Sequence, residues 1–198
     1  MQCILPEKGV DLVMENEKKI NIVDEILEWI ESILFSVFTV SLIFTFIFRP
    51  ARVLGISMEP TLHAEDKLIM SNWFYTPKDK DIVVISSEGL NEAIVKRVIA
   101  TEGQEVNIDF TEGKVYVDGV EQFEPYINNI TTRSFVDEGV AAFEYPVTVP
   151  KDSVFVLGDN RDHSTDSRTT YVGFVPEKDI LGHVIFRFYP FSDFGTLD

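Results

Sequence analysis

The chain has little of the chemistry on which many small proteins depend. It has one cysteine, Cys3, in 198 residues, and its three histidines, His63, His163 and His183, are far apart in the sequence. A single cysteine cannot form an internal disulfide or a CxxC redox pair, and scattered histidines give no support for a metal site. Basic residues are also scarce, since 17 Lys and Arg against 33 Asp and Glu give a net charge of −16. We therefore expect no metal, no cofactor and no nucleic-acid partner.

Charged residues are missing from one long stretch. Residues 32–48 are uncharged and lie between Glu31 and Arg49. As a helix this stretch is about 26 Å long, and adding Trp29–Ile30 brings it to the roughly 30 Å of a hydrocarbon core. A buried core helix and a cleaved signal peptide are the alternatives, but the stretch begins late, follows an acidic segment and has no A-x-A cleavage site. We expect an uncleaved transmembrane anchor over residues 32–48.

The residues before the anchor indicate neither a domain nor an orientation. Residues 1–31 carry 3 basic and 8 acidic side chains and are predicted to form a short polar tail. Isoleucines from Ile22 onward recur at helical spacing, so the tail leads directly into the membrane helix. Three basic residues precede the span and three follow it closely, so the positive-inside rule does not assign a side of the membrane.

Residues 49–198 have the pattern of strands rather than of helices. Seven stretches are rich in β-branched or aromatic side chains, and Asp118-Gly119 predicts a two-residue hairpin turn. Residues 125–150 alternate weakly and are interpreted as an insertion or flap. We predict a mainly β domain with antiparallel pairing and long loops. The predicted strands are 67–71, 81–86, 92–100, 105–108, 114–117, 153–157 and 182–189.

Two short stretches place reactive side chains beside turn formers or inside an apolar strand. Ser57 follows the last membrane residue, Phe48, by nine positions, so it acts within about 30 Å of the bilayer surface. Lys96 and Arg97 interrupt an apolar strand. Burial would lower the pKa of Lys96 and make its amine a proton acceptor at neutral pH. Taken singly, Ser57 fits a turn serine better, and Lys96 fits an edge-strand lysine that reaches water equally well.

A third stretch is the polar loop 158–168, GDNRDHSTDSR, which follows an apolar strand. It looks at first like a calcium loop. However, Arg161 and His163 occupy positions where such a loop needs Asp or Asn, and the closing Glu is absent. An Asp–Arg pair among short donors and acceptors would brace a neighbouring site or simply hold the loop together. Taken alone, the second interpretation is favoured.

Together the three stretches resemble the bacterial type I signal peptidases, peptidase S26 type. These are membrane-bound endopeptidases with a Ser/Lys dyad that remove signal peptides. The matching motifs are S-M-x-P-T-L at 57–62, K-R-V at 96–98 and G-D-N-R-D-x-S-x-D-S-R at 158–168. The resemblance covers nearly the whole chain, from the anchor to His183. It implies an antiparallel β-sheet or partial-barrel catalytic domain behind a single N-terminal transmembrane helix.

The resemblance implies a role for each matching residue. Ser57 would be the nucleophile and Lys96 the general base, so no histidine is needed. The Ser57 backbone N–H would hold the oxyanion. A serine of the third motif would orient the lysine amine through a hydrogen bond, and an Asp–Arg ion pair would support it. These residues are Ser164, Asp166 with Arg168, and Asp159 in the same loop.

Substrate recognition follows from the same resemblance. An extended preprotein segment would pair with residues 50–56 and 93–95 by β-augmentation. Shallow apolar pockets would admit small side chains at the first and third positions before the cut, as in Ala-x-Ala sites. Gly55 stands where some relatives have a second serine that donates to the oxyanion, so the second donor is unassigned. The expected pocket walls are Val53, Met58, Leu62 and Val95.

We predict a single-pass serine endopeptidase of the cell membrane, with its β domain on the extracytoplasmic face, that cleaves exported preproteins through an acyl-enzyme. The orientation comes from the resemblance alone. Its predicted partners are preprotein signal peptides and membrane lipid, and the sequence predicts no oligomeric state. An aromatic run either dips into the membrane surface or belongs to the core; it consists of Trp73, Phe74 and Tyr75.

Three alternatives stay open at this point. One is a specialised processing peptidase of the same family. Another is a self-cleaving repressor with the same dyad, which needs a DNA-binding domain where residues 1–48 supply a membrane helix. The third is a catalytically silent, chaperone-like protein that binds preproteins or pilins. Such a protein would be expected to lack Ser57 or Lys96, and both are present.

Overall fold

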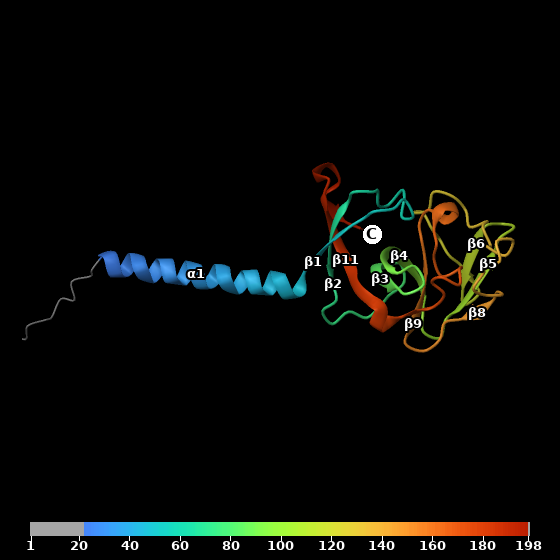
Figure 1. Cartoon of the computed structure of the whole chain (residues 1–198), viewed down its shortest axis with the longest axis horizontal. Helices are drawn as coiled ribbons and strands as arrows, with labels where there is room; N and C mark the ends of the chain where they lie inside the picture. Colours follow the sequence, from blue (N-terminus) through green and yellow to red (C-terminus); the bar gives the residue numbers. More distant parts are fainter. Residues whose placement is uncertain (1–21, 198) are drawn as a thin grey trace, which may run out of the picture. The chain divides into compact units, whose positions relative to one another are not determined.

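The chain forms two compact units, residues 1–42 and residues 43–198. The structure, a computed structural model, describes residues 22–197, so Cys3 and most of the predicted tail 1–31 lie outside the described residues. As far as it is described, the first unit is the larger part of helix α1 (Ile22–Ile47), and the second contains all of the described strands (Figure 1).

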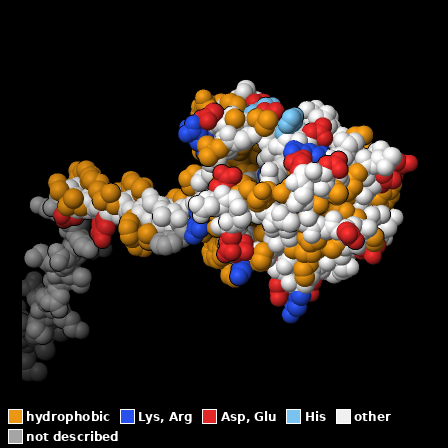
Figure 2. Space-filling model, turned by 45° about the vertical axis from the view of Figure 1, so that its right-hand side comes forward, with side chains coloured by type: hydrophobic (Ala, Val, Ile, Leu, Met, Phe, Trp, Pro, Cys, Tyr) orange, Lys and Arg blue, Asp and Glu red, His pale blue; other side chains and the backbone are white. Residues whose placement is uncertain are grey.

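Helix α1 is apolar along most of its length. Within the described residues it runs from Ile22, ahead of the predicted start at residue 32, because isoleucines at helical spacing continue the apolar pattern into the predicted tail. Its stretch Ile22–Thr45 is about 36 Å long at 1.5 Å per residue, enough to cross a hydrocarbon core of about 30 Å. No described side chain of α1 is buried, and apolar atoms cover much of its surface (Figure 2).

Hydroxyl side chains within α1 bond to the backbone of the helix itself. The hydroxyls of Ser32, Ser36 and Thr39 each donate to the backbone carbonyl four residues earlier. Such bonds satisfy a hydroxyl without water, which an apolar medium requires. The helix is therefore compatible in length, composition and polar bonding with a membrane span.

The second unit is built on an antiparallel sheet. In the described part of the chain, eight strands join it in the order β1-β2-β11-β3-β4-β9-β10, with β12 paired to β11. Strand β4, which carries Lys96, pairs with β3 and β9 and so lies inside the sheet. The strands are β1 Arg49–Arg52, β2 Lys67–Ser71, β3 Ile82–Ser87, β4 Glu92–Thr101, β9 Ser153–Leu157, β10 Val175–Pro176, β11 Ile180–Tyr189 and β12 Gly195–Thr196. Short 3-10 helices are η1 Arg161–His163, η2 Glu177–Asp179 and η3 Phe191–Asp193.

A smaller antiparallel sheet has the order β7-β6-β5-β8. Its turn between β6 and β7 is Asp118-Gly119, with Val117 opposite Val120. Both turn residues have positive φ, 51° and 76°, as a type I′ hairpin requires. The hairpin prediction is confirmed. The strands are β5 Glu105–Asp109, β6 Lys114–Val117, β7 Val120–Glu121 and β8 Val147–Thr148.

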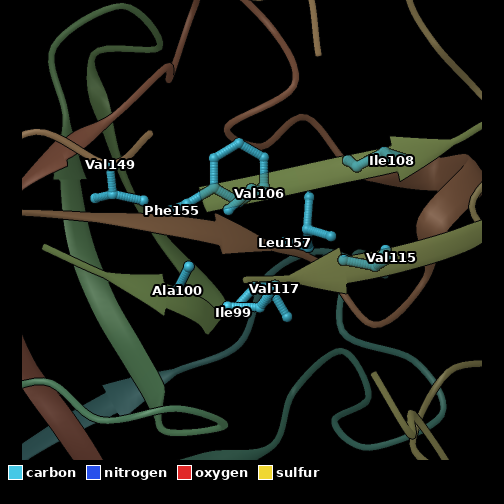
Figure 3. Close-up of a cluster of buried hydrophobic side chains, with 9 residues drawn as sticks. All are labelled: Ile99, Ala100, Val106, Ile108, Val115, Val117, Val149, Phe155 and Leu157. Carbon is cyan, nitrogen blue, oxygen red and sulfur yellow. The ribbon is translucent and has the colours of Figure 1, made fainter. Parts of the chain in front are cut away.

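One cluster of buried side chains joins the two sheets (Figure 3). Strands β4 and β9 of the larger sheet and β5 and β6 of the smaller sheet all contribute to it. Alternate residues of β3 belong to two other clusters, with Ile82 and Val84 on one face of the sheet and Val83 and Ile85 on the other. The joining cluster consists of Ile99, Ala100, Val106, Ile108, Val115, Val117, Val149, Phe155 and Leu157.

The predicted mainly β, antiparallel fold is confirmed, and all seven predicted strands are present with small differences at their ends. Strands β1, β8, β10 and β12 were not predicted. The sequence of β1, Arg-Pro-Ala-Arg, has no strand pattern, and the other three are two-residue pairings that form where packing places backbone beside an existing strand. Residues 125–150 contain β8 but are otherwise mostly loop, with Thr131 and Phe135 buried.

Truncating the ring at the centre of the joining cluster should destabilise the domain strongly. Phe155 is fully buried, and Phe155→Ala should lower the free energy of unfolding by about 3–5 kcal/mol because it leaves a cavity between the sheets. Denaturant unfolding of the full chain in detergent measures this. Phe123 is 77% exposed, and Phe123→Ala is the matched control, with an expected change within about 0.5 kcal/mol. Equal losses in the two variants would contradict the assigned core.

Candidate active site

A cleft of about 440 Å³ is lined by the segment that follows β1 and by the first half of β4. Residues 52–58 form one part of the lining and residues 92–96 another, and the rest comes from Leu90, His163 and Thr165. The cleft lining includes all of one predicted substrate-binding segment, residues 93–95. It also includes residues 52–56 of the other predicted segment, 50–56. The cleft therefore brings together the serine and lysine stretches that stood out separately in the sequence.

Ser57 lies in a tight turn after β1. The Glu59 N–H donates to the Ile56 carbonyl at 3.1 Å, and the Leu62 N–H donates to the Met58 carbonyl at 2.9 Å. Met58 and Leu62 are buried, so the side chains one and five positions after the serine anchor the turn in the core. Ser57 itself is left half-buried at the cleft.

Lys96 reaches the Ser57 hydroxyl from β4. Its Nζ donates to Ser57 Oγ at 2.8 Å and to the Val95 carbonyl at 3.0 Å. Lys96 is 2% exposed, and this burial lowers its pKa from the ordinary 10.5 to about 8, against the opposing effect of three nearby carboxylates. An amine that is partly neutral near pH 8, placed beside a hydroxyl, can accept its proton.

The loop 158–168 is held by a buried ion pair and by its own backbone. Asp166 accepts two bonds from the Arg168 guanidinium, at 2.8 and 2.9 Å, and one from the Gly158 N–H at 3.1 Å. Burial by itself raises the pKa of Asp166, but the charge of Arg168 and these hydrogen bonds outweigh it, so the pKa lies below the ordinary 3.8. The carboxylate is therefore fixed as an anion inside the domain.

Ser164 does not make the predicted bond to the lysine. The Ser164 hydroxyl is buried and forms no hydrogen bond of ordinary geometry with a described residue. It lies close enough to Asp166 to help lower the pKa of that carboxyl. The Lys96 amine is directed instead to Ser57 and to a backbone carbonyl. The predicted Ser164–Lys96 hydrogen bond is therefore absent from the described structure.

Gly158 brings the loop against the serine turn. A β-carbon at Gly158 would lie 2.2 Å from Ser164 Oγ and 2.5 Å from the Ser57 carbonyl oxygen. Both distances are far below contact distance, so only glycine fits at this position. The loop and the Ser57 turn are therefore packed backbone against backbone.

Asp159 joins the serine turn to β4. It accepts two bonds from the Arg97 guanidinium, at 2.9 and 2.8 Å, and one from the Thr61 hydroxyl at 2.5 Å. Arg97 also donates to the Lys80 carbonyl and lies 4.0 Å from the centre of the Tyr126 ring. The sequence analysis did not identify Arg97 or Thr61 as site residues, although both lie within the matched motifs.

Part of the predicted flap is bonded to the loop 158–168. Arg161 pairs with Glu124 and donates to the Thr131 hydroxyl. Arg133 donates to the Asp162 carbonyl at 2.8 Å, and its own carbonyl accepts a bond from Arg168 at 3.1 Å. Residues 124–133 therefore support the loop. A flap formed by the rest of the segment stays a prediction.

Three of the four predicted pocket residues line the cleft, namely Val53, Met58 and Val95. The fourth, Leu62, is fully buried in the hydrophobic cluster that contains Val53 and Met58, and it is not among the described residues of the lining. Leu62 lies one helical turn beyond Met58 and points to the core, so it supports the pocket rather than forming its wall. Leu54, which is 76% exposed, lines the cleft and was not predicted.

The histidines are not gathered at the site. His163 lines the cleft, whereas the His183 ring stacks on Tyr75 with 4.3 Å between ring centres, and His63 is exposed. Within residues 22–197, no three His, Cys, Asp or Glu side chains are grouped as a metal site requires. Of the three histidines, only His163 therefore lines the cleft.

Comparison with known proteins agrees with this geometry. The family described as "Signal peptidase, peptidase S26" matches residues 26–189. The chain is 34% identical over 189 residues to signal peptidase I of Bacillus licheniformis, which covers 93% of this chain and 100% of that protein. It is 35% identical over 181 residues to signal peptidase IB of Staphylococcus aureus (strain COL), covering 86% and 93%.

A solved structure is also similar. The crystal structure of a signal peptidase I from Enterococcus faecalis V583 is 33% identical in sequence and aligns with a TM-score of 0.45, covering 55% of this chain and 97% of that one. The family match and the relatives each span most of this chain, including the cleft and the loop behind it. The chain therefore belongs to the type I signal peptidase family, peptidase S26.

Proposed function

We propose that this signal-peptide-cleaving peptidase uses Ser57 as its nucleophile and Lys96 as its general base, and that it forms an acyl-enzyme on Ser57. The observation that supports the dyad is the 2.8 Å contact between Lys96 Nζ and Ser57 Oγ inside a cleft that excludes water from the amine. A serine hydroxyl is a weak nucleophile until an adjacent base takes its proton. A buried lysine with a pKa of about 8 is matched to that task.

The chemistry proceeds in two halves. Neutral Lys96 takes the Ser57 proton as Oγ bonds to the scissile carbonyl carbon, and the resulting ammonium gives that proton to the leaving amine as the peptide bond breaks. A water molecule then loses a proton to Lys96 and attacks the acyl carbon, and the proton returns to Ser57 as the acyl group leaves. The Ser57 N–H stabilises the oxyanion in both halves. Gly55 has no side-chain donor, so this position supplies no second donor from a side chain.

The cleft also suits the proposed substrate class. Its walls include Val53, Met58 and Val95, all apolar and mostly buried, so a side chain that enters between them is selected by size. An extended peptide that lies along residues 93–95 can add as a strand through backbone hydrogen bonds. Small residues at the first and third positions before the cut, as in Ala-x-Ala sites, satisfy both constraints because alternate side chains of a strand face the same wall.

Removing either member of the dyad should abolish cleavage of a preprotein with an Ala-x-Ala site. We expect Ser57→Ala and Lys96→Ala each to lower kcat by roughly 10³-fold or more, since the two groups act as a unit. The wild-type rate should rise with pH through about 8, because only the neutral Lys96 amine accepts a proton. The assay uses the full chain in detergent across about pH 6 to 10.

Surface variants serve as controls for the dyad. Lys78 and Ser86 are exposed, so Lys78→Ala and Ser86→Ala should keep wild-type rates and the same pH profile. Wild-type cleavage by Ser57→Ala or Lys96→Ala would refute the dyad. So would a wild-type rate that stays flat across the tested pH range.

The proposed location is a single-pass membrane protein with its cleft on the extracytoplasmic side and in contact with lipid. The topology supports the lipid contact. Strand β1 begins at Arg49, directly after α1, and Arg49 pairs with Met70 near the end of antiparallel β2. The chain beyond β2 therefore leaves the sheet at the end where α1 joins it. Trp73 and Phe74 lie there, 58% and 91% exposed, with ring centres 5.5 Å apart.

Trp73 should report this lipid contact. The chain has two tryptophans, so Trp29→Phe leaves Trp73 as the only one. In vesicles of brominated lipid, the fluorescence of this variant should be strongly quenched relative to vesicles of ordinary lipid, because an exposed tryptophan at a bilayer interface lies among the acyl chains and headgroups. Trp73→Phe, which keeps only Trp29 in α1, is the positive control. Unquenched Trp73 beside quenched Trp29 would refute the contact.

A further inference from the structure

Asn160 holds the peptide group that presents the nucleophile. Its side-chain Nδ2 donates to the Ile56 carbonyl at 3.1 Å, and its backbone N–H donates to the Ser57 carbonyl at 3.0 Å. Asn160 is 3% exposed, and these two bonds cross from the loop 158–168 to the serine turn. Asn160 therefore donates to two consecutive backbone carbonyls, one on each side of the Ser57 α-carbon.

The first of these carbonyls belongs to the same peptide unit as the Ser57 N–H. A trans peptide is planar, and its C=O and N–H point in opposite directions. A bond that fixes the direction of the Ile56 carbonyl therefore fixes the direction of the Ser57 N–H. The same bond polarises the amide, which makes the N–H a stronger donor.

The orientation of the Asn160 amide is set by its surroundings. Its Oδ1 is buried and has no hydrogen-bond partner among the described residues. Turning the amide over would place Oδ1 against the Ile56 carbonyl oxygen, where two acceptors repel. The nitrogen is therefore the atom that faces the serine turn, and this donor is what a substitution would remove.

We propose that Asn160 is a positioning residue for the oxyanion donor, because it fixes and polarises the Ile56–Ser57 peptide. This assignment rests on the proposed function of Ser57. It gives the asparagine side chain an effect on the transition state without contact to substrate. Two other anchors of the turn do not depend on that side chain, namely the Glu59 N–H bond to the Ile56 carbonyl and the Asn160 backbone bond. Loss of the side chain therefore loosens the donor while the turn stays folded.

The consequence should be a selective loss of kcat. Removing an oxyanion donor outright costs about 10²–10³ in kcat, so loosening one should cost about tenfold. We expect Asn160→Ala to lower kcat by about that factor, with KM nearly unchanged. Asn160→Asp should lose more than Asn160→Ala, because a carboxylate oxygen replaces the donor and faces the Ile56 carbonyl. The pH at which the rate rises should stay near 8 in Asn160→Ala, because the Lys96 contacts are not touched.

A peptide aldehyde separates this role from a purely structural one. When Ser57 adds to the aldehyde, Oγ bonds to the carbonyl carbon, the carbonyl oxygen becomes the oxyanion and the serine proton passes to Lys96. Affinity for the aldehyde should therefore fall in Asn160→Ala in parallel with kcat. Affinity for the matching peptide alcohol, which cannot form the adduct, should stay at the wild-type value.

Controls make the assignment falsifiable. Asn107 is exposed on β5 of the smaller sheet, and Asn107→Ala should keep wild-type kcat, KM and aldehyde affinity. An Asn160→Ala variant with wild-type kcat beside an inactive Ser57→Ala would refute the role of Asn160 alone, as would equal losses of aldehyde and alcohol affinity. Wild-type activity in Ser57→Ala would refute the dyad and the assignment to Asn160 together.

Discussion

A lysine amine is a base near neutral pH only where water is kept from it, and the arrangement of the cleft depends on meeting that condition at Lys96. Strand β4 lies inside the larger sheet, and the Lys96 side chain on it is 2% exposed. Burial lowers the pKa of Lys96, whereas nearby carboxylates raise it. Asp166, Glu92 and Asp159 each raise the pKa of Lys96, although burial outweighs them.

A buried arginine reduces the effect of these carboxylates on Lys96. Arg97 is bonded to Asp159 and Arg168 to Asp166, and Arg168 itself acts to lower the pKa of Lys96. A buried ion pair adds little net stability, because desolvation of both charges offsets their attraction. These pairs hold the carboxylates that organise the loop, and the charge of Arg168 offsets part of the effect of Asp166 on Lys96. The loop can therefore contain charged residues beside Lys96, although the proposed role of Lys96 as general base requires a neutral amine.

Local patterns in the sequence predict most of the strands of the fold, but they do not predict the long-range contacts that build the site. Strands such as β9 and the hairpin at Asp118-Gly119 follow from β-branched runs and turn chemistry. Contacts such as Thr61 to Asp159 join residues 98 positions apart, and no local pattern specifies them. The resemblance to a family supplied the candidate residues, yet it implied a Ser164–Lys96 bond that the described geometry lacks, and it placed Leu62 in a pocket wall rather than in the core.

The two groups of the proposed dyad come from different kinds of structure, and the loop 158–168 is what joins them. Lys96 lies in a strand of the sheet, whereas Ser57 lies in a turn that is held by its own hydrogen bonds, by the core and by the loop. Gly158 permits the loop to lie directly on that turn, and Asn160 bonds to its carbonyls. Asp159, the residue between them, is bonded both to Thr61 of the turn and to Arg97 on β4. Movement of the turn away from the lysine therefore has to break its hydrogen bonds to the loop or pull the loop from a buried ion pair. The loop thus links the Ser57 turn to the sheet, and this link holds the Ser57 hydroxyl at a fixed distance from the Lys96 amine.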